Sequence, residues 1–175
     1  MFRRQNSTNR TRNHCFRNIF SEAEKYFKIA IEGKAEYLGE CNQDTVDSLV
    51  KLGTMYRADE NPAAAENIFR RLVNSHEKHM GKDNPKTIMH MQSLADTLCS
   101  MNNPSKWKEA TEIYKACIES TKRINNGDDS GGLLTVQYIN KLAAVLLKEK
   151  NYPEAKKHVS LSAGFQLLYF CSGVG

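Results

Sequence analysis

One amphipathic segment occurs four times along the chain at a nearly constant interval. The segment "SEAEKYF" (21–27) is followed by "PAAAENIF" (62–69), "KEATEIY" (108–114) and "PEAKKHV" (153–159). A small residue occupies the equivalent place in each segment, at Ala23, Ala65, Ala110 and Ala155, with steps of 42, 45 and 45 residues. Self-similarity at such a period is typical of repeat proteins, in which each unit packs only on its neighbours.

Apolar residues between these segments follow the i, i+3, i+4, i+7 spacing of one helix face. Asn61 and Pro62 separate a first helix that ends near Ala58 from a second helix that begins near Pro62. Three such stripes indicate the first helix of each of three hairpins. They are Leu49, Leu52, Gly53 and Tyr56, then Met91, Leu94, Ala95 and Leu98, and finally Ile139, Leu142, Ala143 and Leu146. The small residues mark points where helices approach closely. The pattern therefore predicts an all-α chain of antiparallel helix-turn-helix hairpins.

The repeat boundaries predict the domain organisation. We expect a solenoid over 21–160. It begins with a single helix over 21–38 that corresponds to the second helix of a hairpin, and hairpins follow over about 44–80, 86–125 and 133–160. Ala23, Phe27 and Ala30 are expected on the buried face of the single helix. Trp107 and Tyr152, at equivalent places in two turns, are expected to wedge apart the helices of their hairpins. Residues 161–175 form an apolar tail in which the pattern stops. An altered or truncated terminus is expected, and a cap formed by Phe165, Leu168 and Tyr169 is the alternative.

Charge is concentrated at the start of the chain. The formal net charge is +5, yet residues 1–20 hold five arginines and no acid, so the remaining 20 basic residues balance 20 acidic ones. A body without net charge argues against nucleic-acid binding. An Arg-rich, acid-free leader is typical of a mitochondrial transit peptide, and a basic flexible tail is the alternative.

The candidate disulfide, metal-binding and catalytic residues lack the spacing that such sites require. The five cysteines form no CxxC motif, which argues against a disulfide framework or a structural zinc site and favours a reducing, cytoplasmic compartment. His76 and His79 do not fit HExxH, so we expect two solvated histidines and no metal site. Cys117 lies on a helix stripe, where core packing is expected. No apolar run reaches the roughly 20 residues of a membrane span, and neither a catalytic constellation nor a cofactor motif is present.

The phrases "LGECNQDTVDSLVKLGTMY" and "MGKDNPKTIMHMQSLADTL" identify the family resemblance. They resemble the tetratricopeptide repeat, in the variety of about 42 residues found in kinesin light chains. This resemblance implies an α-solenoid that coils into a right-handed superhelix, with the first helices lining a concave face. The phrases "TIMHMQSLADTL" and "KLAAVLLKEKNYPEAK" also resemble the mitochondrial tetratricopeptide protein associated with respiratory complex III.

The resemblance implies a non-catalytic scaffold that binds a peptide segment of a partner protein in its concave face. An assembly or maintenance factor for a respiratory complex is the alternative. Basic residues outnumber acidic ones at the groove positions, so an acidic peptide is expected. Asn140 resembles an asparagine that bonds the peptide backbone in related grooves. The groove residues implied by the family pattern are Lys51, Thr54, Arg57, Gln92, Asp96, Asn140, Lys141 and Lys148.

Overall fold

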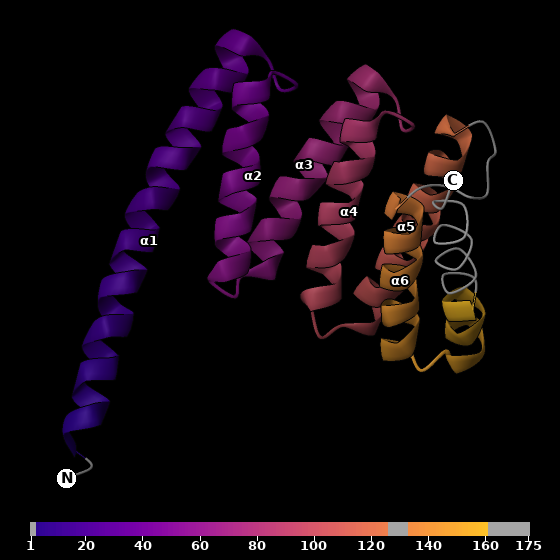
Figure 1. Cartoon of the computed structure of the whole chain (residues 1–175). Coiled ribbons are helices and arrows are strands. Elements are labelled where there is room, and N and C mark those ends of the chain that lie inside the picture. The colour runs from indigo at the N-terminus through magenta and orange to yellow at the C-terminus, as the bar shows by residue number, and fades with distance from the viewer. Residues whose placement is uncertain (1–2, 126–132, 161–175) are drawn as a thin grey trace, which may run out of the picture. The chain divides into compact units, whose positions relative to one another are not determined.

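Seven helical segments make up the described part of the computed structural model, which covers residues 3–125 and 133–160, with side chains from residue 19 onward. Six of them are labelled in Figure 1. They are α1 (Arg3–Leu38), α2 (Gln43–Ala58), α3 (Pro62–Met80), α4 (Pro85–Ser100), α5 (Pro104–Ile124) and α6 (Leu133–Lys148), and a short helical stretch follows over 152–160. The described residues include no strand, and the predicted all-α class built of helical hairpins is confirmed.

Three helices begin at the same dipeptide, Asn-Pro. At α3, the Asn61 side chain accepts a hydrogen bond from the Ala64 amide (3.2 Å), which satisfies one of the unpaired N–H groups of the first turn. Asn84 and Asn103 cap α4 and α5 in the same way. Proline suits the first helical position because its fixed φ is already helical and no donor is lost there. Two of these dipeptides lie in the turns within hairpins, and Asn84-Pro85 begins the first helix of the next hairpin.

Two glycines end the helices that precede the turns between repeats. Gly39 follows α1 with φ of 90°, and Gly81 follows α3 with φ of 84°. Both angles lie in the region that favours glycine because a side chain would clash with the backbone. The Thr87 hydroxyl then donates to the Gly81 carbonyl (2.9 Å) and ties the turn to the start of α4.

The chain divides into two compact units, Met1–Leu52 and Gly53–Gly175, with the boundary inside α2. In the first unit, Lys34 on α1 donates to the Ser48 hydroxyl on α2 (2.9 Å). Ile31 and Val46 are among the buried apolar side chains of this unit. The first unit is therefore a helix pair with a small apolar core.

In the second unit, each helix from α3 to α6 packs on the next one along the chain. The small residues lie at these contacts. A Cβ at Gly53 would lie 2.9 Å from the Phe69 ring, so α2 and α3 can approach this closely only at a residue without a side chain. Five alanines at the predicted contact positions of this unit are also buried: Ala65, Ala95, Ala110, Ala143 and Ala155. Close approach at small residues is thus confirmed as the packing rule.

Three expectations differ from the structure. Helix α1 begins at Arg3, which differs from the flexible tail that was one of two expectations for residues 1–20, beside a transit peptide. No proline or glycine before Gly33 interrupts the helix. Ala23 and Phe27 are half-buried as expected, but Ala30 is exposed, and Ile31, four residues beyond Phe27, is the buried residue that continues this face. Trp107 donates to the Met101 carbonyl (2.7 Å) within its turn, whereas Tyr152 projects into solvent. The tail over 161–175 lies outside the described residues.

Replacing Ala110 with leucine should destabilise the second unit by about 1–3 kcal/mol, because the added atoms overpack a helix contact. Ala110 is fully buried on α5, and Ala116 is exposed on the same helix. Ala116→Leu is therefore the matched control and should leave stability nearly unchanged. Urea unfolding followed by circular dichroism measures both. Equal stability of the two variants would contradict the assigned helix faces.

Candidate functional site

An ion pair at two of the predicted groove residues joins α4 to α6. Lys141 Nζ lies 2.5 Å from Asp96 Oδ2 and 2.7 Å from Asp96 Oδ1. The Tyr114 hydroxyl, from α5, donates to the same Oδ1 atom (2.5 Å). The two charges offset each other, so Lys141 does not supply the free positive charge that the sequence pattern suggested. Together the three side chains link α4, the first helix of one hairpin, to α6, the first helix of the next hairpin.

Tyr114 is the member of this cluster that the sequence did not assign to a polar role. It ends the repeated segment 108–114, whose pattern indicated only a helix, and its ring is buried. Burial, and then its hydrogen bond to Asp96, raise the pKa of the Tyr114 hydroxyl far above its ordinary value. The hydroxyl therefore stays protonated and remains a donor that holds Asp96 in place.

Lys148 lies one repeat beyond the end of α4 and reaches back to it. Its ammonium donates to the Cys99 carbonyl (2.9 Å), which belongs to the last turn of α4. A cation is favourable there because the final carbonyls of a helix lack partners inside the helix. No carboxylate pairs with Lys148 among the residues that the structure describes. Its positive charge therefore remains available on this surface.

Two amide side chains lie on the same pair of helices. Asn140 on α6 is exposed, and Gln92 on α4 is half-buried. Neither side chain has a hydrogen-bond partner within the described ranges. An amide offers both a donor and an acceptor, which is the pairing that an extended peptide backbone requires. The structure thus leaves both amides free to bind.

The remaining predicted groove residues lie on α2. Lys51, Thr54 and Arg57 are all exposed. Lys51 belongs to the first compact unit, and Thr54 and Arg57 belong to the second. Arg57 has no acidic partner in the described part of the chain. Arg57 and Lys148 are accordingly cations of the second unit that an acidic ligand could neutralise.

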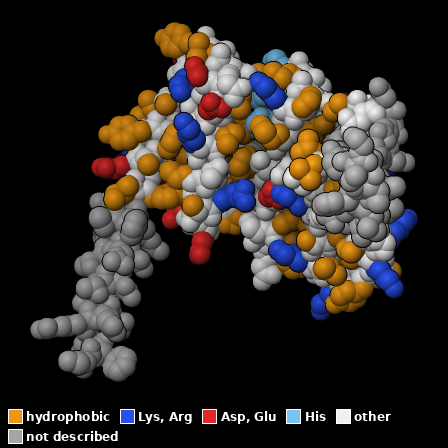
Figure 2. Space-filling view, viewed as in Figure 1, with side chains coloured by type: hydrophobic (Ala, Val, Ile, Leu, Met, Phe, Trp, Pro, Cys, Tyr) orange, Lys and Arg blue, Asp and Glu red, His pale blue; other side chains and the backbone are white. Residues whose placement is uncertain are grey.

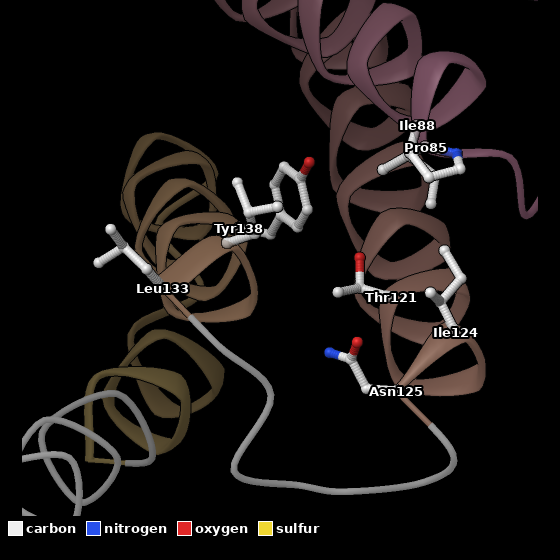
Figure 3. Close-up of a pocket in the computed structure, with 8 residues that line it drawn as sticks. Pro85, Ile88, Thr121, Ile124, Asn125, Leu133 and Tyr138 are labelled. Carbon is white, nitrogen blue, oxygen red and sulfur yellow. The ribbon is translucent and has the colours of Figure 1, made fainter.

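A pocket of about 330 Å³ opens between α6 and the pair α4 and α5 (Figure 3). Its walls include Ile88 from the first turns of α4, Ile124 at the end of α5, and Leu133, Leu134 and Tyr138 from the start of α6. Three of these side chains are exposed although they are large and apolar: Ile124, Leu133 and Leu134. The volume lies at the lower end of the range for ligand pockets. The pocket can hold one or two apolar side chains.

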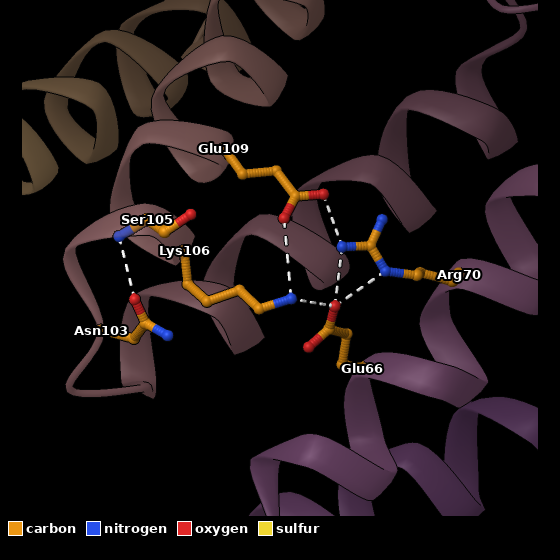
Figure 4. A network of polar contacts seen from close by, with 6 residues as sticks. All are labelled: Glu66, Arg70, Asn103, Ser105, Lys106 and Glu109. Carbon is orange, nitrogen blue, oxygen red and sulfur yellow. Dashed lines mark hydrogen bonds and ion pairs between the residues drawn. The ribbon is translucent and has the colours of Figure 1, made fainter.

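A second polar network joins α3 to α5 (Figure 4). Glu66 accepts from Arg70 Nε (2.8 Å) and from Lys106 (2.6 Å), and Arg70 also donates to Glu109 (2.5 Å). Burial alone would raise the pKa of Glu66, but the hydrogen bonds from Lys106 and Arg70 outweigh burial and hold this pKa below its ordinary value. Each charge has a partner of opposite sign, so the network fixes the contact between repeats and offers little to a ligand.

These polar contacts share a signal that sequence reasoning missed. Asp96 and Lys141 are 45 residues apart, and Glu66 and Lys106 are 40 apart. Asp83 and Arg123, which form a two-pronged ion pair at 2.6 and 3.1 Å, are also 40 apart. Opposite charges separated by about one repeat period therefore identify the bonds between neighbouring repeats.

His76 differs from the expectation that it would be solvated. It is fully buried on α3, and its ring meets that of His90 on α4 edge to face, with centroids 4.5 Å apart. His76 Nδ1 lies 3.0 Å from the Leu72 carbonyl, whereas Nε2 of both histidines lacks a partner within the described residues. His79, by contrast, is exposed as expected. The prediction of a solvated His76 was wrong because this residue lies one turn beyond Leu72 on the buried face of α3.

Cys41, Cys99 and Cys117 are free thiols. Cys117 is fully buried, as its stripe position predicted, and burial raises the pKa of its thiol to about 12. No group of three or more His, Cys, Asp or Glu side chains in the described ranges could hold a metal ion. Within those ranges, no helix has the length and apolar character needed to cross a membrane.

Comparison with known proteins shows which repeat family and which solved structures the chain resembles. Residues 45–86 match a family model described as tetratricopeptide repeat. No curated protein sequence matches the chain. The fold is similar to that of BtubC (BKLC) from P. vanneervenii, with a TM-score of 0.72 and 13% identity over 90% of this chain. The chain spans 60% of the length of BtubC.

A second solved structure shows the same likeness. It contains nearly identical TPR-like repeats from a Podosopora anserina protein assigned as a kinesin light chain. The TM-score is 0.69 with 15% identity, over 89% of this chain and 71% of the other. The tetratricopeptide resemblance is therefore confirmed in sequence over residues 45–86, and the kinesin-light-chain type is confirmed as a likeness of fold.

Acidification should destabilise the protein through His90. Burial, and then the nearby His76 and Lys86, lower the pKa of His90 to about 4 from 6.5. Between these two values the unfolded chain binds the proton and the folded chain does not, so the unfolding free energy falls as pH drops from 6.5 to 4. The loss attributable to this shift is at most about 3 kcal/mol.

Urea unfolding at several pH values checks this expectation. His90→Phe removes the titrating ring and should flatten the pH dependence over that range, whereas His79→Phe, at an exposed site, should retain it. An unchanged slope in His90→Phe would assign the acid sensitivity to other groups.

Proposed function

We propose that this tetratricopeptide-repeat protein is a non-catalytic scaffold that binds a peptide segment of a partner protein along α4 and α6. Repeats of this family suggest a protein-interaction scaffold. The observation that carries the proposal is the arrangement of Lys148 and Asn140 on one helix. Beside them, the neutral Asp96–Lys141 pair holds α4 and α6 together. The surface thus combines an unneutralised cation with a free amide on a rigid support.

The chemistry of this surface defines the segment that it would bind. Lys148, with Arg57 on α2, favours a carboxylate, and the amides of Asn140 and Gln92 match the hydrogen-bonding groups of a peptide backbone. The Asp96–Lys141 pair contributes no net charge. The favoured partner is accordingly an acidic segment, and its affinity should fall as salt concentration rises.

The apolar pocket extends the same surface. Leu134 precedes Lys141 by seven residues and Lys148 by fourteen, so all three lie along one side of α6. Fourteen residues of helix span about 21 Å, which an extended peptide covers in about six residues. We therefore expect an apolar residue in the partner segment about six positions from an acidic one.

Selection of random twelve-residue peptides displayed on phage, with the full chain as bait, tests the proposal. We expect enrichment of acidic peptides that carry an apolar residue at that spacing. Fluorescence anisotropy with one selected peptide should then show about tenfold weaker binding for Lys148→Glu and for Arg57→Glu, because each change replaces attraction with repulsion.

Controls separate this surface from general charge effects. Lys108→Glu makes the same charge change at an exposed position of α5 and should leave the peptide affinity unaltered. Leu134→Ser should weaken binding without affecting the fold, because this side chain is exposed. If no peptide is enriched, or if affinity is indifferent to both Lys148→Glu and Arg57→Glu, the assigned surface is wrong.

A second candidate function rests on the leader. The five arginines of residues 1–20 occur without any acid, and residues 3–20 continue α1 as helix. A basic helical leader fits import into mitochondria, where the scaffold would act as an assembly or maintenance factor for a respiratory complex.

A fluorescent fusion of residues 1–30 tests this alternative by microscopy. A mitochondrial signal that is lost when the five arginines are replaced by glutamine would support it. A diffuse cytosolic signal would leave the cytoplasmic scaffold as the proposal.

A further inference from the structure

Helix α1 carries an apolar stripe that the fold of its own unit does not use. Tyr26, Ala30, Gly33 and Tyr37 follow one another at steps of four, three and four residues, so they lie on one side of the helix. Tyr26 is 72% exposed and Tyr37 is 85% exposed. We call these four residues the α1 stripe.

The α1 stripe is separate from the face that packs within the first unit. That face includes Ile31, which is buried, and Lys34, which bonds to Ser48 on α2. Ile29, which flanks the stripe, is 67% exposed. Apolar residues that are scattered singly over a protein surface need no explanation. Exposed tyrosine and isoleucine along one continuous helix surface are instead typical of an interaction site.

The order of large and small residues in the stripe reads the same in both directions. A twofold axis between Ile31 and Glu32 exchanges Ala30 with Gly33 and Tyr26 with Tyr37. An antiparallel copy of the helix would therefore set the small residues against each other at the crossing point and the tyrosines of one helix beside those of the other. A Cβ at Gly33 would have no described atom within 4 Å, so this position is open to a neighbouring helix.

We infer that a second copy of this chain covers the α1 stripe, with the two α1 helices antiparallel about this axis. Self-complementarity is what a twofold interface requires, since the same patch serves both subunits. Four tyrosines at roughly 150 Å² each, with the residues between them, give about 1,000 Å² of buried surface in total. That area is at the lower limit for a specific interface, so we expect a dimer that dissociates in the micromolar range.

Sedimentation velocity of the full chain from low to high micromolar concentration tests the inference. We expect a reversible equilibrium between monomer and dimer, and Tyr26→Glu or Tyr37→Glu should weaken it at least tenfold. Tyr152→Glu is the matched control, because this tyrosine is also exposed but lies outside the stripe. The control should associate as the unmodified chain does.

Gly33→Gln separates association from folding. The new side chain has room in the monomer and favours the helix more than glycine does, so the melting temperature should rise or stay level. At the same time it would block the crossing point, so the dissociation constant should increase at least tenfold. A variant that associates as strongly as the unmodified chain would overturn the inference.

The antiparallel register has its own test. Tyr26→Lys and Tyr37→Glu should each weaken self-association. A mixture of the two variants should associate more tightly than either alone, because the introduced ammonium of one chain would face the introduced carboxylate of the other. A mixture that associates no better than its components would overturn this register. A chain that is monomeric at every concentration, even if its stripe binds a helix of some other protein, would overturn the second copy as the occupant.

Discussion

Close approach of helices at small side chains is the constraint on which the second unit depends. Gly53 lets the Phe69 ring lie where a side chain would otherwise be, and the contacts between later helices repeat this arrangement with alanines. Helix axes come within the usual packing distance only where facing residues leave room. Because this condition recurs once in every repeat, the same packing geometry can recur without any other identity between the repeats.

Polar contacts give this packing its register. Apolar helix faces tolerate small shifts along their axes, whereas an ion pair with a buried tyrosine donor, such as Asp96, Lys141 and Tyr114, is satisfied in one arrangement only. The network around Glu66 and Arg70 has the same effect on another pair of helices. These contacts also decide which charges of the surface remain for a partner, so packing and binding cannot be separated here.

The sequence predicted the hairpins well because their signals are local. The Asn-Pro break and the stripes at helical spacing each involve residues within a few turns, and the structure places α2 to α6 where these signals lie. The candidate site was harder to predict, because it depends on which side chains pair across repeats. Lys141 was counted as a free cation because its partner, Asp96, is distant in the sequence. His76 was misplaced for a related reason, since only His90 on the next helix shows that it is buried.

The bonds that cross between repeats, from Thr111 with Glu149 to Lys148 with Cys99, join residues 38 to 49 positions apart. No contact of this kind requires the chain to close a much longer loop, so the entropy lost on forming each one is small. Such a topology is expected to fold quickly and in steps. During synthesis, a hairpin could dock on its predecessor as soon as the next forty or so residues leave the ribosome, and it would not wait for the end of the chain.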